Sequence, residues 1–197
     1  MLKAVIKKIV DAQIKKGMLQ EEERNIYLYG YQMLFEFGIN IMTSILIAYI
    51  FQAYTIVFTF TISYLAVRGY VGGYHARTSL GCFCCSASIL IISVIIVKGI
   101  SAWEIEFGTF FLEVLMLPCI FQRTPMPDIN KPITENEESY FNKKVKQIYL
   151  VELIIEIVLF VCGLDIFALS IWAVHLVLFT MVLFDFLTKR CVIRTKN

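Results

Sequence analysis

Long apolar runs dominate this sequence, and the first of them constrains the fold most strongly. Between Ile26 and Val67 the only formal charge is Glu36. A helix that crosses a bilayer needs about 20 apolar residues, so this run is long enough for two crossings with a break at residues 52–55. Charged residues make up only 17% of the chain, against roughly 25% in soluble domains. The pattern predicts an all-α polytopic membrane protein.

Further apolar segments bring the predicted number of transmembrane helices to six. The expected spans are about 31–51, 54–67, 80–97, 106–121, 147–163 and 166–187. Ahead of them, residues 1–24 carry apolar side chains at helical spacing with lysines mostly on the other face, which predicts an amphipathic helix lying in the headgroup layer. No signal peptide is expected there, since the segment has no apolar core. Residues 1–197 should therefore form a single membrane domain.

The distribution of basic residues predicts the orientation. Lysine and arginine favour cytoplasmic segments. With the N-terminus inside and six crossings, every one of the 18 basic residues except Lys98 falls in a cytoplasmic segment or tail. We therefore expect a multi-pass protein of the cell membrane with both termini in the cytoplasm.

One short connection between two apolar runs carries the residues best suited to chemistry. It runs from Arg68 through Gly72, Gly73, His75 and Arg77 and reaches Cys82 at the start of the next run. A histidine near a cysteine can stabilise the thiolate and act as its base. The alternative is that His75 is a solvated loop residue and Cys82 a small packing residue. Because the connection is predicted to be cytoplasmic, Cys82 should stay a free thiol.

The seven-residue spacing between His75 and Cys82 restricts the local structure. On one straight helix the two residues would lie about 10.5 Å apart along the axis, too far for a catalytic contact. The helix that carries Cys82 should therefore begin near Ser79, with Thr78 or Ser79 as its N-cap. The N-terminal end of that helix would also stabilise a thiolate.

Two neighbouring cysteines compete with Cys82 for the role of nucleophile. Cys84 and Cys85 point about 200° and 300° around a helix from Cys82, so at most one of the three faces His75 well. Cys82 is nearest to the aqueous interface and is our choice. The cysteine spacing does not match the usual metal or redox motifs, and no metal or cofactor is expected.

The glycine-rich connection, with its cysteine seven residues after the histidine, resembles the accessory gene regulator B (AgrB) family of Gram-positive quorum sensing. The resemblance extends to Tyr29-Gly30, to the proline-bearing loop 123–133 and to the size and six-span layout. Gln32 stands where an acidic residue is expected in the family, and the Cys84-Cys85 doublet makes the nucleophile less unique.

This resemblance implies a membrane-embedded cysteine endopeptidase. His75 would be the base and Cys82 the nucleophile, supported by Arg68, Gly72, Gly73 and Arg77. The enzyme would cleave the C-terminal tail of an AgrD-like precursor and cyclise the product through an acyl-enzyme thioester into a thiolactone or lactone autoinducing peptide. Expected partners are that precursor and membrane lipid, with a homodimer as an open option and no nucleic acid.

Several ionisable residues fall inside the predicted spans, where they are costly and indicate function by default. Glu152 and Glu156 lie one turn apart and should line a cavity or pair with a basic residue of another helix. His175 is expected to serve a structural hydrogen bond. A second hypothesis uses Glu113, Glu152, Glu156 and His175 as the polar path of a small peptide transporter or export component, in which Cys82 would be dispensable.

Overall fold

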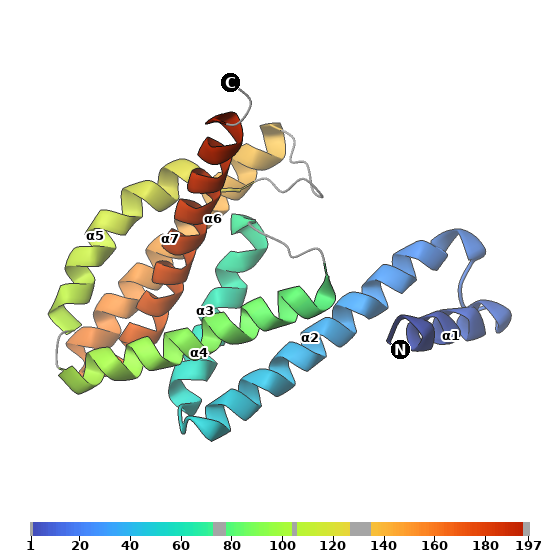
Figure 1. The fold of residues 1–197 in the computed structure, drawn as a ribbon, viewed down its shortest axis with the longest axis horizontal. Coiled ribbons are helices and arrows are strands. Elements are labelled where there is room, and N and C mark those ends of the chain that lie inside the picture. The colour runs from blue at the N-terminus through green and yellow to red at the C-terminus, as the bar shows by residue number, and fades with distance from the viewer. Residues whose placement is uncertain (1, 73–77, 104–105, 127–134, 195–197) are drawn as a thin grey trace. The chain divides into compact units, whose positions relative to one another are not determined.

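The computed structural model describes residues 2–72, 78–103, 106–126 and 135–194. All regular elements in these ranges are helices, as the apolar pattern predicts. The α-helices are α1 (Leu2–Lys15), α2 (Arg24–Ile50), α3 (Tyr54–Val71), α4 (Ser79–Trp103), α5 (Glu106–Arg123), α6 (Glu135–Val161) and α7 (Asp165–Arg194), with a 3-10 turn at Glu21–Glu23 (Figure 1). The chain divides into two compact units, Met1–Ser44 and Ile45–Asn197.

The first unit contains α1 and the first part of α2. The apolar face of α1 buries Ile6 and Val10. Arg24, at the start of α2, pairs with Asp11, and Gln13 Nε2 donates a hydrogen bond to the Tyr31 hydroxyl at 2.7 Å. The amphipathic helix is shorter than the predicted segment 1–24, because it ends at Lys15 and the chain turns at Gly17.

The second unit is built around α7, which packs against α3, α4, α5 and α6 (Figure 1). Its buried face combines small and large apolar side chains, among them Ala173, Val174 and Leu178. Trp172 Nε1 donates a hydrogen bond to the backbone carbonyl of Thr109 on α5 at 3.1 Å. This bond helps to fix the rotation of α5 about its own axis. As a result, the polar side chains of α5 and α6 that face inward contact α7.

The turn between α6 and α7 lies where the sequence predicts it. Gly163 has φ of 73°, a conformation that glycine adopts without the steric cost of a Cβ. Its N–H bonds to the Phe160 carbonyl at 3.0 Å, and the Leu164 N–H bonds to the Leu159 carbonyl at 2.9 Å. This pair of bonds satisfies the free carbonyls at the end of α6, so α7 can begin two residues later at Asp165.

The helices match the expected spans in order, although several are longer. α6 begins at Glu135, twelve residues before the predicted start at residue 147, and α4 and α7 extend to Trp103 and Arg194. Three segments are long and apolar enough to cross a membrane by length and composition, namely Glu21–Ile50, Leu80–Ala102 and Asp165–Leu187. The other helices also expose large apolar side chains, including Phe58, Ile62, Phe111, Val114, Ile154 and Val158.

Candidate functional site

Cys82 lies in the first turn of α4, at the position that the sequence predicts. Thr78 is the N-cap of this helix, because its Oγ1 accepts a hydrogen bond from the Gly81 N–H at 3.1 Å. The Thr78 carbonyl accepts the first helical bond, from the Cys82 N–H at 3.0 Å. The predicted start near Ser79 is therefore confirmed, and of the two predicted cap residues, Thr78 and Ser79, the cap is Thr78. The positive end of the helix dipole lies beside the half-buried thiol.

The thiol of Cys82 has neighbours on the last turns of α3. The Tyr64 hydroxyl is hydrogen-bonded to Arg68 and lies close enough to Cys82 to interact with it electrostatically. Tyr64 and Arg68 are both half-buried and occur one helical turn apart. The structure thus brings Arg68 and Cys82 to the same end of the bundle and adds Tyr64, which the sequence analysis did not identify.

Gly72 ends α3 and contacts the loop that follows α5. It has φ of 72° and forms an isolated parallel bridge with Met126, in which the Met126 N–H bonds to the Val71 carbonyl at 2.8 Å. A Cβ at Gly72 would collide with the Met126 backbone carbonyl. Two motifs of the resemblance, the glycine run and the proline-bearing loop, therefore touch at this point.

Further contacts tie the start of α6 and the end of α5 to the same region. Asn142 Nδ2 donates a hydrogen bond to the Thr124 carbonyl at 2.7 Å, and the rings of Tyr70 and Phe141 meet edge to face. The Arg123 guanidinium lies 3.8 Å from the ring centroid of Phe186 on α7. The end of α3, the end of α5, the start of α6 and the late part of α7 thus form one packed end of the bundle.

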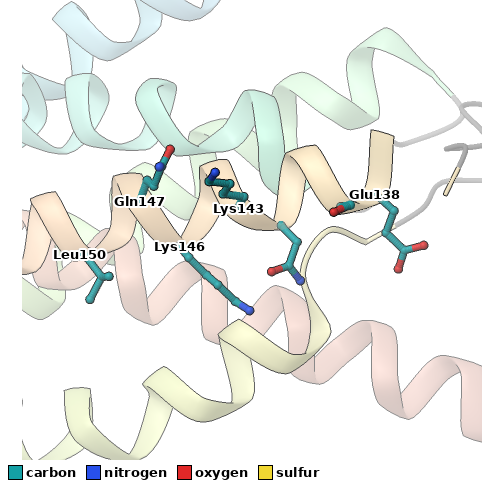
Figure 2. A pocket seen from close by; sticks show the side chains of 7 residues that line it. Glu138, Lys143, Lys146, Gln147 and Leu150 are labelled. Atoms are coloured by element: carbon teal, nitrogen blue, oxygen red, sulfur yellow. The ribbon is translucent and has the colours of Figure 1, made fainter. Parts of the chain in front are cut away.

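A shallow groove of about 680 Å³ lies on the first half of α6, beside this packed end. Figure 2 shows Lys143, Lys146 and Gln147 in the middle of the groove, with Glu138 at one end and Leu150 at the other. The remaining lining residues are Ser139 and Asn142. The groove combines two ammonium groups with amide and hydroxyl groups, a composition suited to a peptide that carries carboxylates.

Three of the predicted site residues, Gly73, His75 and Arg77, lie outside the described residues. Of the three clustered cysteines, Cys82 is half-buried while Cys84 and Cys85 are exposed, and all three are free thiols. Cys119 is half-buried and Cys162 exposed, also as free thiols. The described part of the site therefore consists of Tyr64, Arg68, Gly72 and Cys82, with the backbone of Met126.

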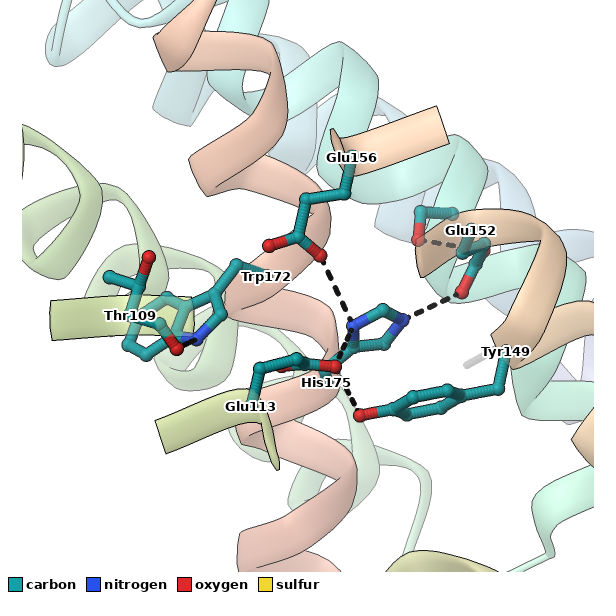
Figure 3. Close-up of polar contacts among 8 residues, drawn as sticks. Thr109, Glu113, Tyr149, Glu152, Glu156, Trp172 and His175 are labelled. Atoms are coloured by element: carbon teal, nitrogen blue, oxygen red, sulfur yellow. Dashed lines mark hydrogen bonds and ion pairs between the residues drawn. The ribbon is translucent and has the colours of Figure 1, made fainter. Parts of the chain in front are cut away.

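A second polar cluster lies inside the bundle, around His175 (Figure 3). The imidazole Nδ1 lies 2.8 Å from Glu113 Oε1 and 3.6 Å from Glu156 Oε2, and Nε2 lies 3.3 Å from Glu152 Oε2. The sequence analysis expected Glu152 and Glu156 to line a cavity or to pair with a basic residue on another helix, and they pair with His175. Glu113 joins them from α5, so the four residues that the transporter hypothesis grouped together lie in one cluster.

Outer contacts hold this cluster in place. The Ser63 hydroxyl donates a hydrogen bond to Glu152 Oε1 at 2.8 Å, and the Tyr149 hydroxyl donates one to Glu113 Oε1. The Tyr149 ring also stacks on the His175 imidazole with centroids 4.0 Å apart. Four helices, α3, α5, α6 and α7, therefore contribute to one buried polar centre.

These features define the class of protein. Helical membrane proteins have long apolar helices that expose large apolar side chains on the outside of the bundle. Their ionisable side chains face the interior, as the carboxylates here face the central helix α7. The chain belongs to the accessory gene regulator B family, whose model matches residues 4–183. Members of this family function with an AgrD precursor peptide in quorum-sensing peptide processing. No curated protein and no solved structure matches the chain.

Proposed function

We propose that this protein is a cysteine endopeptidase that cleaves an AgrD-like precursor and cyclises the product, with Cys82 as nucleophile and His75 as base. The observation that carries the proposal is the setting of Cys82. It occupies the first turn of a Thr78-capped helix, is half-buried, and interacts electrostatically with Tyr64, which is itself hydrogen-bonded to Arg68. A thiol at a helix N-terminus is stabilised as the nucleophilic thiolate.

The reaction follows from the chemistry of a thiolate and an imidazole. The Cys82 thiolate attacks the scissile carbonyl of the precursor, and the imidazolium of His75 gives a proton to the departing amine of the tail. The body of the precursor stays on Cys82 as a thioester. A cysteine or serine side chain within the precursor then attacks this thioester, which releases Cys82 and closes a thiolactone or lactone ring. Because the thioester retains the energy of the peptide bond, cyclisation needs no ATP.

The surroundings of Cys82 support this choice of nucleophile over its neighbours. Cys84 and Cys85 are exposed on α4, whereas Cys82 is close to Tyr64 and, through it, to Arg68. We assign Arg68 and Tyr64 to positioning the substrate carbonyl and the thiolate. The resemblance gives supporting roles to Gly72, Gly73 and Arg77 as well.

The groove on α6 supports binding of an acidic precursor tail. Lys143 and Lys146 face the groove (Figure 2), and Lys144 lies over the Tyr140 ring at 5.7 Å from its centroid. Basic residues in this segment also serve to fix membrane orientation, and both roles are compatible. We propose that the tail lies along the first half of α6, while the precursor leader binds lipid.

The fold also supports six crossings with the site at the cytoplasmic face. α5 and α6 carry charges that lower their mean hydropathy, but Glu113, Glu152 and Glu156 are buried against α7 and their helices expose apolar side chains outward. Lys98, the one basic residue predicted to lie outside, donates a hydrogen bond to the Phe51 carbonyl at the α2–α3 turn. That turn is also predicted to lie outside, at the opposite end of α3 from Gly72.

The alternative function is a peptide transporter or export component, which requires a polar path across the bilayer. The polar residues assigned to that path are buried on all sides, with exposed fractions of 2% for Glu113, 1% for Glu156 and 0% for His175. They form an enclosed cluster, and this favours the peptidase over the transporter.

The two functions are separated by a cleavage assay. The full chain is reconstituted in vesicles containing anionic lipid and given a precursor with an amphipathic leader, an internal cysteine and an acidic tail. Cys82→Ala should abolish release of the tail, and Cys84→Ala should leave it within about twofold of wild type. Release that continues with Cys82→Ala and stops with Cys84→Ala would reassign the nucleophile, and an absence of release with the wild-type chain would favour the transporter.

A further inference from the structure

We propose that the buried cluster around His175 is a binding site for one divalent transition-metal cation, held by Glu113, Glu156 and His175 Nδ1. The ligand atoms of these three side chains all lie within 4.8 Å of one another. They come from α5, α6 and α7, so a bound ion would connect three helices of the bundle (Figure 3). The site is separate from the thiol chemistry of Cys82.

Three buried polar atoms of these side chains have no hydrogen-bond partner. Glu113 Oε2, Glu156 Oε2 and His175 Nδ1 are fully buried and make no hydrogen bond. The exposed fraction of each of these three residues is at most 2%. A buried polar atom without a partner is costly, and two carboxylate oxygens and one imidazole nitrogen of this kind in one cluster mark a position that a cation would stabilise.

One tautomer of His175 presents a lone pair at Nδ1. The Nε2 atom faces Glu152 Oε2 at 3.3 Å, and Glu152 is held in turn by the Ser63 hydroxyl at 2.8 Å. When Nε2–H donates to Glu152, Nδ1 is unprotonated and faces two more carboxylates. A carboxylate behind the non-ligating nitrogen is the usual outer support of a metal-binding histidine.

The spacing of the ligand atoms brackets the range expected around a small ion. Zinc bonds to histidine nitrogen and carboxylate oxygen are about 2.0–2.2 Å, so adjacent ligands at angles of about 90–110° lie roughly 2.9–3.4 Å apart. The separations from His175 Nδ1 are 2.8 Å to Glu113 Oε1 and 3.6 Å to Glu156 Oε2, on either side of that range. One imidazole with two carboxylates is a donor set that suits zinc and related divalent ions.

The charges in the cluster are also unequal. Within the described ranges, His175 is the one basic side chain in ion-pair contact with Glu113, Glu152 and Glu156. Three carboxylates against one imidazole leave a negative excess in a medium that disfavours it. A divalent cation would balance two of the three negative charges. The Tyr149 hydroxyl donates a hydrogen bond to Glu113, and the Ser63 hydroxyl donates one to Glu152.

The test uses the full chain, purified without chelator through an affinity tag that contains no histidine and held in lipid nanodiscs. Elemental analysis after loading with zinc and gel filtration should give about one zinc per chain. X-ray absorption of the zinc form should show a single imidazole with oxygen ligands at about 2.0–2.1 Å. Loading with Co²⁺ should give the visible d–d absorption of a protein-bound ion.

Variants separate this site from others in the chain. His175→Gln and Glu156→Gln should lose the bound ion, and Glu152→Gln, which removes only the outer support, should weaken affinity about 10- to 100-fold. The chain has two histidines, so His75→Ala is the matched control and should keep full occupancy. Glu36→Gln, which removes a carboxylate from another apolar helix, should keep it too.

Wild-type protein that holds no zinc after loading would overturn the proposal. Occupancy that is lost with His75→Ala and kept with His175→Gln would also overturn it, as would an absorption spectrum dominated by sulfur ligands from the cysteines. The spectrum of wild type decides the matter even if His175→Gln fails to fold.

Discussion

Gly72 and Met126 lie in direct backbone contact, although 54 residues separate them in the sequence. The Met126 N–H bonds to the Val71 carbonyl at 2.8 Å, and the Met126 carbonyl occupies the space where a Cβ of residue 72 would lie. The contact joins the end of α3, which precedes the connection with His75, to the loop after α5. We infer that this junction sets the direction in which the catalytic connection leaves α3.

Replacement of Gly72 by alanine should therefore disrupt the site. With φ of 72° and ψ of −144°, Gly72 has a backbone conformation that is essentially restricted to glycine, and an added Cβ would collide with the Met126 carbonyl. We expect Gly72→Ala to lower the cleavage rate more than tenfold and to lower the thermal unfolding temperature in detergent.

Gly69→Ala is the matched control for this change. Gly69 lies within α3, three residues earlier, and nothing lies within 4 Å of an added Cβ. Alanine is favoured over glycine in a helix by up to about 1 kcal/mol, so the variant should be as stable as wild type and as active. Equal activity of both variants would contradict the role given to the Gly72–Met126 contact.

The N-cap of α4 gives a second prediction. Thr78→Ala removes the hydrogen bond from the Gly81 N–H to Thr78 Oγ1, and loss of such a cap costs about 1 kcal/mol. The first turn, which carries Cys82, should fray, and the cleavage rate should fall about fivefold at unchanged expression.

Thr180→Ala serves for comparison, since Thr180 Oγ1 bonds to the Val177 carbonyl in the middle of α7 and caps no helix end. Precursor cleavage under single-turnover conditions reports the rate directly. If Thr78→Ala cleaves as fast as Thr180→Ala, the cap does not organise the nucleophile.

Local signals in the sequence predicted the parts of this fold that depend on few residues. The break near Gln52, the turn at Gly163 and the Thr78 cap follow from residue types that favour particular backbone conformations. Hydropathy did not predict the early start of α6, because residues 135–146 are polar and form a helix that need not contact lipid. The long helix therefore continues past the span that apolar composition defines.

The contacts of the site were harder to predict, because they depend on how helices are rotated about their axes. Nothing near Tyr64 in the sequence indicates that it interacts with Cys82, and the direct contact of Glu113 with His175 follows only from how α5 packs on α7. Glu152 and Glu156 were expected to share one face because they are one turn apart. Their partner on α7 became evident only from the packing of α6 against that helix.

The groove on α6 predicts how the precursor tail is recognised. The double variant Lys143→Gln, Lys146→Gln should raise KM for an acidic-tailed precursor several-fold with little change in kcat, because the groove is lined by these residues and lies apart from the thiol. Wild-type KM should rise with salt more steeply than that of the double variant.

Lys8→Gln, which removes an exposed lysine from α1, should leave KM unchanged. A precursor whose tail carboxylates are replaced by amides should bind wild type and the double variant equally well. An unaltered KM in the double variant with the acidic precursor would show that the tail binds elsewhere.

The six-crossing arrangement can be tested by labelling exposed positions. In a cysteine-free background, Leu164→Cys in the α6–α7 turn should react with an impermeant maleimide added to intact cells. Glu138→Cys near the start of α6 should react only after the cells are opened. If only α2, α4 and α7 crossed the membrane, residues 138 and 164 would lie on the same side and would label alike.

The most direct test of the central claim is to trap the acyl-enzyme. A precursor whose internal nucleophile is replaced by alanine cannot cyclise, so the thioester should accumulate when the reaction is quenched in acid. Tandem mass spectrometry should then locate the precursor fragment on Cys82, and hydroxylamine should remove it. An adduct on Cys84 or Cys85, or continued cleavage with no adduct on residue 82 at any time, would contradict the account.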